Sequence, residues 1–202
     1  MRYLIFFSLC LMMACIGDNA VETIENPTED GGKERFDRRK SDFAKQGHYQ
    51  RFYANGTVAE DAFYQNDTLH GERKLFLPNG TMETLETYQN GQFHGPFRHY
   101  YENGVMEVEL IYENNAIEGI ARAWYPNGVL KETVTFKANE ENGAFIEYYE
   151  NGNLKAEGTY SPGEDMPVEQ GELKEYDEQG RLIRQAYCTD GRCATTWLRE
   201  EN

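Results

Sequence analysis

Short runs of alternating apolar and polar residues fill most of the chain, and glycines separate these runs at fixed intervals. From residue 47 onward a glycine opens a unit every 24 residues, and a last unit follows after 28; these are Gly47, Gly71, Gly95, Gly119, Gly143 and Gly171. A second glycine follows nine residues after each of them, at Gly56, Gly80, Gly104, Gly128, Gly152 and Gly180. Such self-similarity indicates a repeat architecture, in which a unit buries its apolar face only against its neighbours.

Aromatic and apolar positions repeat in the same register. An aromatic residue stands five positions after the unit glycine in every unit: Phe52, Phe76, Tyr100, Trp124, Tyr148 and Tyr176. A second one stands seventeen positions after it in five units: Tyr64, Tyr88, Tyr112, Phe136 and Tyr160. The second glycine usually follows asparagine, between runs rich in Tyr, Phe, Thr and Val, and this pattern is typical of a β-hairpin.

The exceptions at the Asn-Gly pair indicate the kind of turn. Pro78 and Pro126 precede the pair in two units, and Gln179 replaces the asparagine in the sixth. Proline fits the second position of a type I turn, whereas glutamine tolerates positive φ poorly. We therefore expect a type I turn closed by a glycine in the left-handed region.

Further turn signals lie about twenty residues into the units, at Asn66-Asp67, Asn90-Gly91 and Asn114-Asn115. They predict that the chain reverses again into the next hairpin. The expected fold is all-β, an elongated single-layer antiparallel meander of about six hairpins and roughly 60 Å in length. Residues 161–170 contain Pro162, Gly163 and Pro167, and they predict the loop behind the single 28-residue spacing.

The first residues predict export. Arg2 is the only charge in residues 1–14, and the apolar run after it is typical of a signal peptide and too short to span a bilayer. Residues 11–15, Leu-Met-Met-Ala-Cys, resemble the lipobox of bacterial lipoproteins, although leucine is more usual where Met12 stands. The resemblance implies lipidation at Cys15 and a lipid-anchored protein of the cell envelope, on the outer membrane, periplasmic or surface face. The alternative is a plain cleaved signal.

The remaining boundaries follow from composition. Residues 15–35 are mostly polar and have no aromatic, so we expect a lipidated, flexible tether that reaches about 25 Å. Residues 36–46 contain Phe36 and Phe43 and predict a partial N-terminal cap, either a partial strand or a short helix. The repeat array is expected over residues 47–187, and a cap hairpin over residues 188–202.

Charge narrows the class of partner. The chain has 20 basic and 35 acidic residues, a net charge of −15. Nucleic acid and anionic lipid headgroups are poor partners for such a surface, because their phosphates require Lys and Arg. A basic protein would be attracted. The alternative is that the charge only keeps a tyrosine-rich sheet soluble.

Two cysteines near the C-terminus flank a turn sequence. Cys188 and Cys193 enclose Thr-Asp-Gly-Arg, which sets them opposite each other on adjacent strands at a separation that suits a disulfide. We expect a disulfide that clamps the last hairpin. The alternative, a redox-active pair, lacks the Cys-x-x-Cys spacing.

Motifs for catalysis, cofactors or metals are missing from the sequence, so no catalytic, cofactor-binding or metal-binding residue is predicted. His70 and His94 occupy equivalent places in adjacent units, about 10 Å apart, which is too far for a shared zinc ion. An enzyme acting on envelope glycan would need clustered carboxylates with raised pKa values. The sequence therefore favours a binding module.

The unit from Gly143 to Tyr160 resembles the bacterial MORN-repeat variant, which is found in proteins commonly labelled YwqK-family antitoxins. The resemblance covers about residues 47–185. It implies a sheet of hairpins and a role in protein interaction or membrane attachment, without a catalytic site. We expect a membrane-anchored module that binds an unknown protein, a basic one being favoured, through the six aromatics that follow the unit glycines.

Two alternatives stay open at this point. The protein could be an antitoxin or immunity lipoprotein that neutralises an exported toxin. The six aromatic rings could also serve only to pack neighbouring units together, without contacting a partner.

Overall fold

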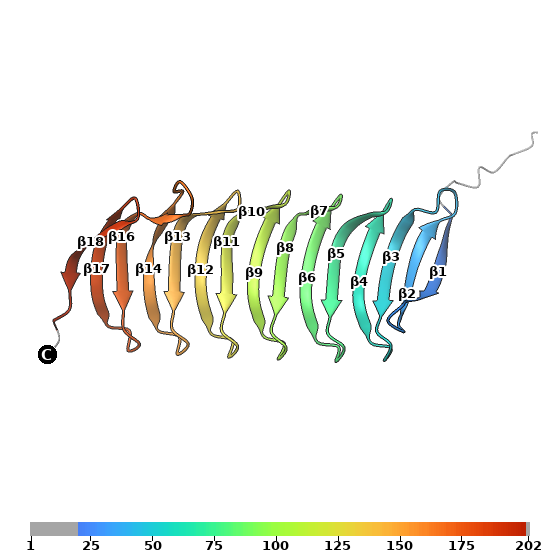
Figure 1. Cartoon of the computed structure of the whole chain (residues 1–202), viewed down its shortest axis with the longest axis horizontal. Helices are drawn as coiled ribbons and strands as arrows, with labels where there is room; N and C mark the ends of the chain where they lie inside the picture. Colours follow the sequence, from blue (N-terminus) through green and yellow to red (C-terminus); the bar gives the residue numbers. More distant parts are fainter. Residues whose placement is uncertain (1–19, 201–202) are drawn as a thin grey trace, which may run out of the picture.

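The computed structural model describes residues 20–200 and shows one open antiparallel sheet (Figure 1). The described residues contain strands and turns and no helix, and the predicted all-β meander is confirmed. The strands are β1 (Val21–Pro27), β2 (Lys33–Arg39), β3 (Lys45–Phe52), β4 (Val58–Gln65), β5 (Thr68–Phe76), β6 (Met82–Gln89), β7 (Gln92–Phe93), β8 (Gly95–Tyr100), β9 (Met106–Glu113), β10 (Ala116–Ile117), β11 (Gly119–Trp124), β12 (Leu130–Lys137), β13 (Glu140–Tyr148), β14 (Leu154–Ser161), β15 (Val168–Glu169), β16 (Gly171–Tyr176), β17 (Leu182–Thr189) and β18 (Arg192–Leu198).

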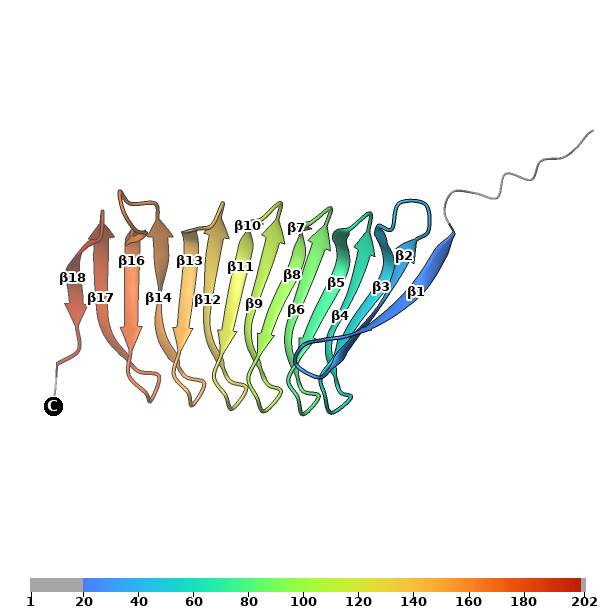
Figure 2. The same ribbon diagram turned by 45° about the vertical axis from the view of Figure 1, so that its right-hand side comes forward.

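Successive strands lie side by side in chain order, and both views show a single layer (Figures 1 and 2). The two-residue strands β7, β10 and β15 pair with the same neighbours as β8, β11 and β16, namely β6, β9 and β14. Each short strand is therefore the first part of one longer strand, interrupted next to the unit glycine. The sheet has two edges, β1 and β18.

The hairpin turns at the second glycines have the predicted form. In the first unit, the Gly56 N–H donates to the Tyr53 carbonyl and the Tyr53 N–H donates to the Thr57 carbonyl, each over 2.9 Å. Gly56 has φ of +86°, in the left-handed region, and the two residues before it do not. The strand register shifts between Arg51 and Phe52, just before this turn. This is a type I turn followed by a glycine bulge.

The turns at the opposite end of the hairpins are of another type. Asn66 and Asp67 both have positive φ, of 51° and 60°, and so do both residues of the pairs Asn90-Gly91, Asn114-Asn115, Ala138-Asn139 and Asp190-Gly191. Two consecutive residues with positive φ make the type I′ turn of a tight hairpin. One such pair, Ala138-Asn139, was not predicted from the sequence.

Buried side chains gather on one side of the sheet, which we call the core face. They form a row across the strands, and register pairs such as Tyr49 with Ala62 and Val134 with Phe145 hold it together. Members of the row are less than 10% exposed: Tyr49, Ala62, Ala121, Val134, Phe145, Ala156, Leu173 and Ala186. Because strand side chains alternate between faces, the neighbours of these residues in sequence point to the opposite side, the open face.

The flexible tether expected over residues 15–35 is wrong for its described part. Val21–Pro27 pairs along its whole length with Lys33–Arg39. Composition pointed to disorder because the segment buries little apolar surface. The strand is instead held by its backbone ladder and by polar side chains across it: Arg38 binds Glu22 at 2.8 Å and Lys33 binds Glu25 at 3.1 Å.

The segment over residues 36–46 contains no helix. Phe36 lies within β2, and Phe43 lies in the turn between β2 and β3 with 63% of its surface exposed. The strand alternative was therefore the right one for this segment. The predicted signal peptide, residues 1–14, and Cys15 lie outside the described residues.

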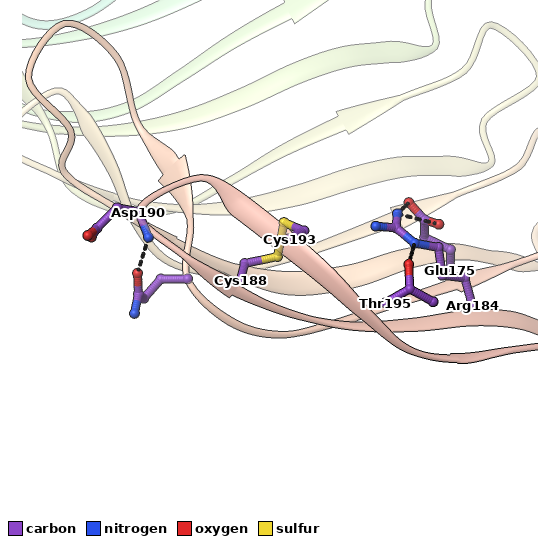
Figure 3. The surroundings of a disulfide bond; sticks show 7 residues. Glu175, Arg184, Cys188, Asp190, Cys193 and Thr195 are labelled. Atoms are coloured by element: carbon purple, nitrogen blue, oxygen red, sulfur yellow. Dashed lines mark hydrogen bonds and ion pairs between the residues drawn. A yellow bond between two sulfur atoms is a disulfide. The ribbon is translucent and has the colours of Figure 1, made fainter.

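A disulfide joins Cys188 of β17 to Cys193 of β18, as Figure 3 shows, and the Cα atoms are 3.9 Å apart. Cys188 stands seventeen residues after Gly171 and pairs with it, as Tyr160 pairs with Gly143. The last unit thus has a buried sulfur, 1% exposed, where the other units have a ring. Cys188 is therefore the last member of the row of side chains that stand seventeen positions after the unit glycines, and the disulfide fixes it to β18.

Candidate interaction surfaces

Tyrosines six positions after the unit glycine join neighbouring hairpins. Each donates its phenol O–H to the backbone carbonyl of an aromatic residue in the next unit, over 2.7 to 2.9 Å. The pairs are Tyr53 to Phe76, Tyr101 to Trp124, Tyr125 to Tyr148 and Tyr149 to Tyr176. Sequence reasoning missed this role, although the tyrosine recurs in four of the six units.

Turn asparagines have a second role between units. The Asn55 Oδ1 accepts the Thr57 N–H inside its own turn, and the Asn55 Nδ2 donates to the Pro78 carbonyl of the next turn at 2.9 Å. The same donation to the next turn recurs at Asn103, Asn127 and Asn151. The stacked turns are therefore linked side chain to backbone, which adds rigidity to an edge of the sheet.

The six candidate interaction aromatics lie beside these turns and are partly buried. Each is paired across its own hairpin with the apolar residue that follows the turn glycine. The pairs are Phe52 with Val58, Phe76 with Met82, Tyr100 with Met106, Trp124 with Leu130, Tyr148 with Leu154 and Tyr176 with Leu182. Their contact with a partner stays a prediction, because much of each ring is already used within the hairpin.

Other large apolar side chains are more exposed, and these lie on the open face. Phe63, Ile111, Ile120 and Tyr187 are 44%, 38%, 45% and 55% exposed. Ile111 pairs with Pro96 of β8, and the register of β11 with β9, in which Arg122 pairs with Glu109, brings Ile120 opposite Ile111. Pro96, Ile111 and Ile120 therefore form an apolar patch across β8, β9 and β11. Sequence reasoning missed it, since these residue types do not repeat between units.

Aromatic rings form a second feature, on the core face. Phe93 stacks on Tyr88 at 4.6 Å and on Tyr112 at 5.0 Å between ring centroids, and Phe145 stacks on Tyr160 at 4.4 Å. Burial, followed by the charge of Glu141 and other carboxylates, raises the pKa of Tyr160 to about 12. Burial likewise raises the pKa of Tyr88 to about 12.

A charged network interrupts the row of buried apolar side chains in the second unit. The Arg73 guanidinium binds Glu60 at 2.6 Å and Glu86 at 2.9 Å, and the Tyr88 phenol donates to Glu86 at 3.0 Å. Both carboxylates are almost buried, with side-chain exposures of 12% and 11%. Each charge in this network has a partner of opposite charge, and this pairing offsets the cost of burying charged groups.

An open depression of about 300 Å³ lies on the core face toward the C-terminal end. It is lined by residues of β13 to β17, among them Phe145, Tyr160, Glu169 and Leu173. Aromatic rings and carboxylates both line this depression, which lies next to the stacked pair of Phe145 and Tyr160.

Histidines and acidic residues do not gather into a metal site. Within residues 20–200 no group of three or more potential ligands could hold an ion. The Nδ1 atoms of His70 and His94 are buried and have no hydrogen-bond partner in the described part of the chain. The described residues also include no apolar helix of membrane-spanning length.

Comparison with known proteins gives one family. The model of the MORN repeat variant matches residues 45–66, 69–90, 93–114, 117–138 and 141–161, together more than half of the chain. The sixth unit, which begins at Gly171, forms the same hairpin outside the matched ranges. No curated protein matches the chain. The periodic hairpins and the five matches agree, and the chain belongs to the MORN repeat variant family.

Proposed function

We propose that this protein is a membrane-tethered module that binds a partner protein on its open face and catalyses no reaction. This is a specific form of the role as a repeat-protein interaction module that MORN repeats suggest. The observation that carries it is the apolar patch of Pro96, Ile111 and Ile120, on a face that no second layer formed by residues 20–200 covers. Exposed apolar patches on soluble domains usually mark interaction sites.

The acidic balance of the chain favours a basic partner. With a net charge of −15, the sheet would attract a positively charged protein over long range and speed its association. The apolar patch would then supply the short-range contact. The six aromatics that follow the unit glycines would contribute at the rim, since they are only partly exposed.

Residues 11–15 support the tether. Their likeness to a lipobox supports lipidation at Cys15, which would place the protein in the cell envelope. Only five residues separate Cys15 from the start of β1 at Val21, so the Cα atoms of Cys15 and Val21 can lie at most about 20 Å apart. The N-terminal edge of the sheet would thus stay close to the membrane, nearer than a long flexible tether would allow.

Lipidation is tested by labelling cells with an alkyne fatty acid. The full chain should take up the label and sediment with membranes, and Cys15→Ala should lose both properties. A matched control is Cys10→Ala, which should behave as the wild type. Equal labelling of Cys15→Ala and the wild type would contradict the tether.

The interaction is tested by crosslinking in cells that express the tagged full chain. A protein should be captured by the wild type and reduced at least tenfold with the double variant Ile111→Ser and Ile120→Ser. Met166→Ser is the matched control, because Met166 is 70% exposed but lies in a loop away from the patch. The same captured proteins with all three chains would contradict the docking surface.

Immunity against an exported toxin would be a special case of the same role. The combination of an export signal with an acidic sheet favours it, since a basic toxin would meet the protein outside the cytosol. Identification of the captured protein as a toxin that the full chain inhibits would establish this form of the proposal.

A further inference from the structure

The N-terminal end of the core face shows how this fold holds a cation. The Lys45 ammonium lies 4.7 Å from the ring centroid of Tyr49 and 5.1 Å from those of Phe36 and Tyr64. Such distances give attraction between the charge and the ring faces. Lys45 stands two residues before the unit glycine Gly47, so its position, although not its charge, has an equivalent in each of the other units.

The fifth unit keeps two of these rings and reverses the charge. Phe145 and Tyr160 stand where the first unit has Tyr49 and Tyr64, and Glu141 stands in the place of Lys45. Phe145 and Tyr160 stack with their centroids 4.4 Å apart. A cation that the first unit supplies from its own chain is therefore replaced by a carboxylate in the fifth.

Two carboxylates near these rings, those of Glu141 and Glu169, have no ion-pair partner among the described residues. Glu169 pairs in register with Tyr160, and both line the open depression. The basic side chains close by are already engaged, since Lys155 binds Glu147 at 2.6 Å and Arg184 binds Glu175 at 3.0 Å. Among the described residues, no basic side chain forms an ion pair with Glu141 or Glu169.

The shape of the depression fits a slender side chain. The buried Phe145 ring is part of its lining and lies close to the backbone of residue 158, where a Cβ would be 2.7 Å from the Phe145 Cε1. Leu173 adds an apolar wall. A side chain with an apolar stem and a charged end matches this combination of wall, rings and carboxylates.

We propose that the depression binds a lysine side chain of a partner protein, with its ammonium over the Tyr160 ring and beside Glu169. The site lies on the core face, opposite the apolar patch, and goes beyond the proposed function, on which it rests only for the presence of a partner protein. A metal ion fits it less well, because rings line the site and fewer than three potential metal ligands come together in the described chain.

The test is an NMR titration of the ¹⁵N-labelled chain from residue 16 onward, which contains every element of the described fold. The probe is the peptide acetyl-Gly-Lys-Gly-amide, and its control has norleucine in place of lysine, with a similar stem but no charge. The lysine peptide should shift the Gly143 and Gly158 amides saturably, since these residues pair with Tyr160 and Phe145. The norleucine peptide should not.

Three variants separate this site from a general effect of charge. Glu169→Gln keeps the shape and should weaken binding about two- to fivefold, the range expected for one partly exposed charge pair. Glu172→Gln is the matched control, because Glu172 lies on the open face of the adjoining strand with its side chain 78% exposed, and it should bind as the wild type. Glu141→Lys puts an ammonium where the first unit has one and should block the peptide.

Equal shifts with the lysine and norleucine peptides, or wild-type affinity in Glu169→Gln, would overturn the proposed site. Neither result bears on capture through the open-face patch, because the titration contains no partner protein. Loss of the proposed function would appear instead in the crosslinking experiment, as capture that does not depend on Ile111 and Ile120.

Discussion

Replacement of Gly158 by alanine tests how tightly the core face is packed. A Cβ at this position would lie 2.7 and 2.8 Å from the Cε1 and Cζ atoms of Phe145 and 3.3 Å from the Cδ1 of Leu173. Gly158 is not in the left-handed region, so its backbone accepts alanine. The effect of the change is therefore one of packing. Phe145 is only 4% exposed and is stacked on Tyr160, which leaves its ring little freedom to move.

Two opposing terms set the magnitude. An extra methyl group in a well-packed core costs about 1–3 kcal/mol. Alanine also reduces the conformational freedom of the unfolded chain, which returns about 0.4–1 kcal/mol. We expect Gly158→Ala to lower the free energy of unfolding by about 1–2 kcal/mol, since the ring is held on its other side.

Urea unfolding followed by circular dichroism measures this difference, with an m-value that should stay unchanged. Phe145→Leu removes the two ring atoms that the new methyl group would meet. In the double variant the alanine should therefore cost little, with a coupling energy of about 1 kcal/mol or more between the two sites. Wild-type stability of Gly158→Ala, or strictly additive effects in the double variant, would refute the packing argument.

Three further predictions concern turns, links between units and pH. Gly56→Ala should cost about 1–2 kcal/mol from its backbone alone, because nothing lies within 4 Å of the new Cβ, and Gly56→Asn should cost less; equal losses in urea unfolding would contradict this. Tyr125→Phe removes the 2.9 Å bond to the Tyr148 carbonyl and should cost about 1 kcal/mol by the same assay, whereas no loss would contradict a structural link. Folded-state pKa values of about 12 mean that three phenols keep their protons when the unfolded chain loses them, so stability should fall as pH rises from about 10 to 12. These phenols are those of Tyr49, Tyr88 and Tyr160, and ultraviolet titration should show that they ionise above pH 10 only in the folded chain. Ionisation of every tyrosine near pH 10 in the folded chain would contradict this prediction.

Local backbone requirements made the turns predictable. A glycine with positive φ after Asn, and a proline at Pro78 or Pro126, each restrict the chain within a few residues. The links between units were not predictable in this way. The Asn55 amide binds the carbonyl of Pro78, 23 residues away, and a carbonyl acceptor leaves no trace in the sequence.

The first strand shows where composition misleads. Residues 20–35 bury too little apolar surface to fold alone, and a prediction from composition considers the segment without the sheet that it joins. Here the segment adds to the edge of an existing sheet, where backbone pairing and the ion pair of Glu22 with Arg38 hold it.

The candidate surfaces were also only partly predictable. The six aromatics after the unit glycines were found because they repeat, yet they are partly buried within their hairpins. Ile111 and Ile120 were missed because they do not repeat. Lys45 and Glu141 occupy equivalent positions, but their opposite charges acquire meaning only when the register places them beside stacked rings.

The elongated single layer, in which no other part of residues 20–200 covers either face, underlies every functional proposal above. Small-angle X-ray scattering of the chain from residue 16 onward, measured at several concentrations, tests it directly. About fifteen strand positions at 4.7–4.9 Å give a sheet about 70 Å long and a radius of gyration of about 22 Å. A radius of about 16–17 Å, expected for a compact globule of this length, would contradict the open sheet.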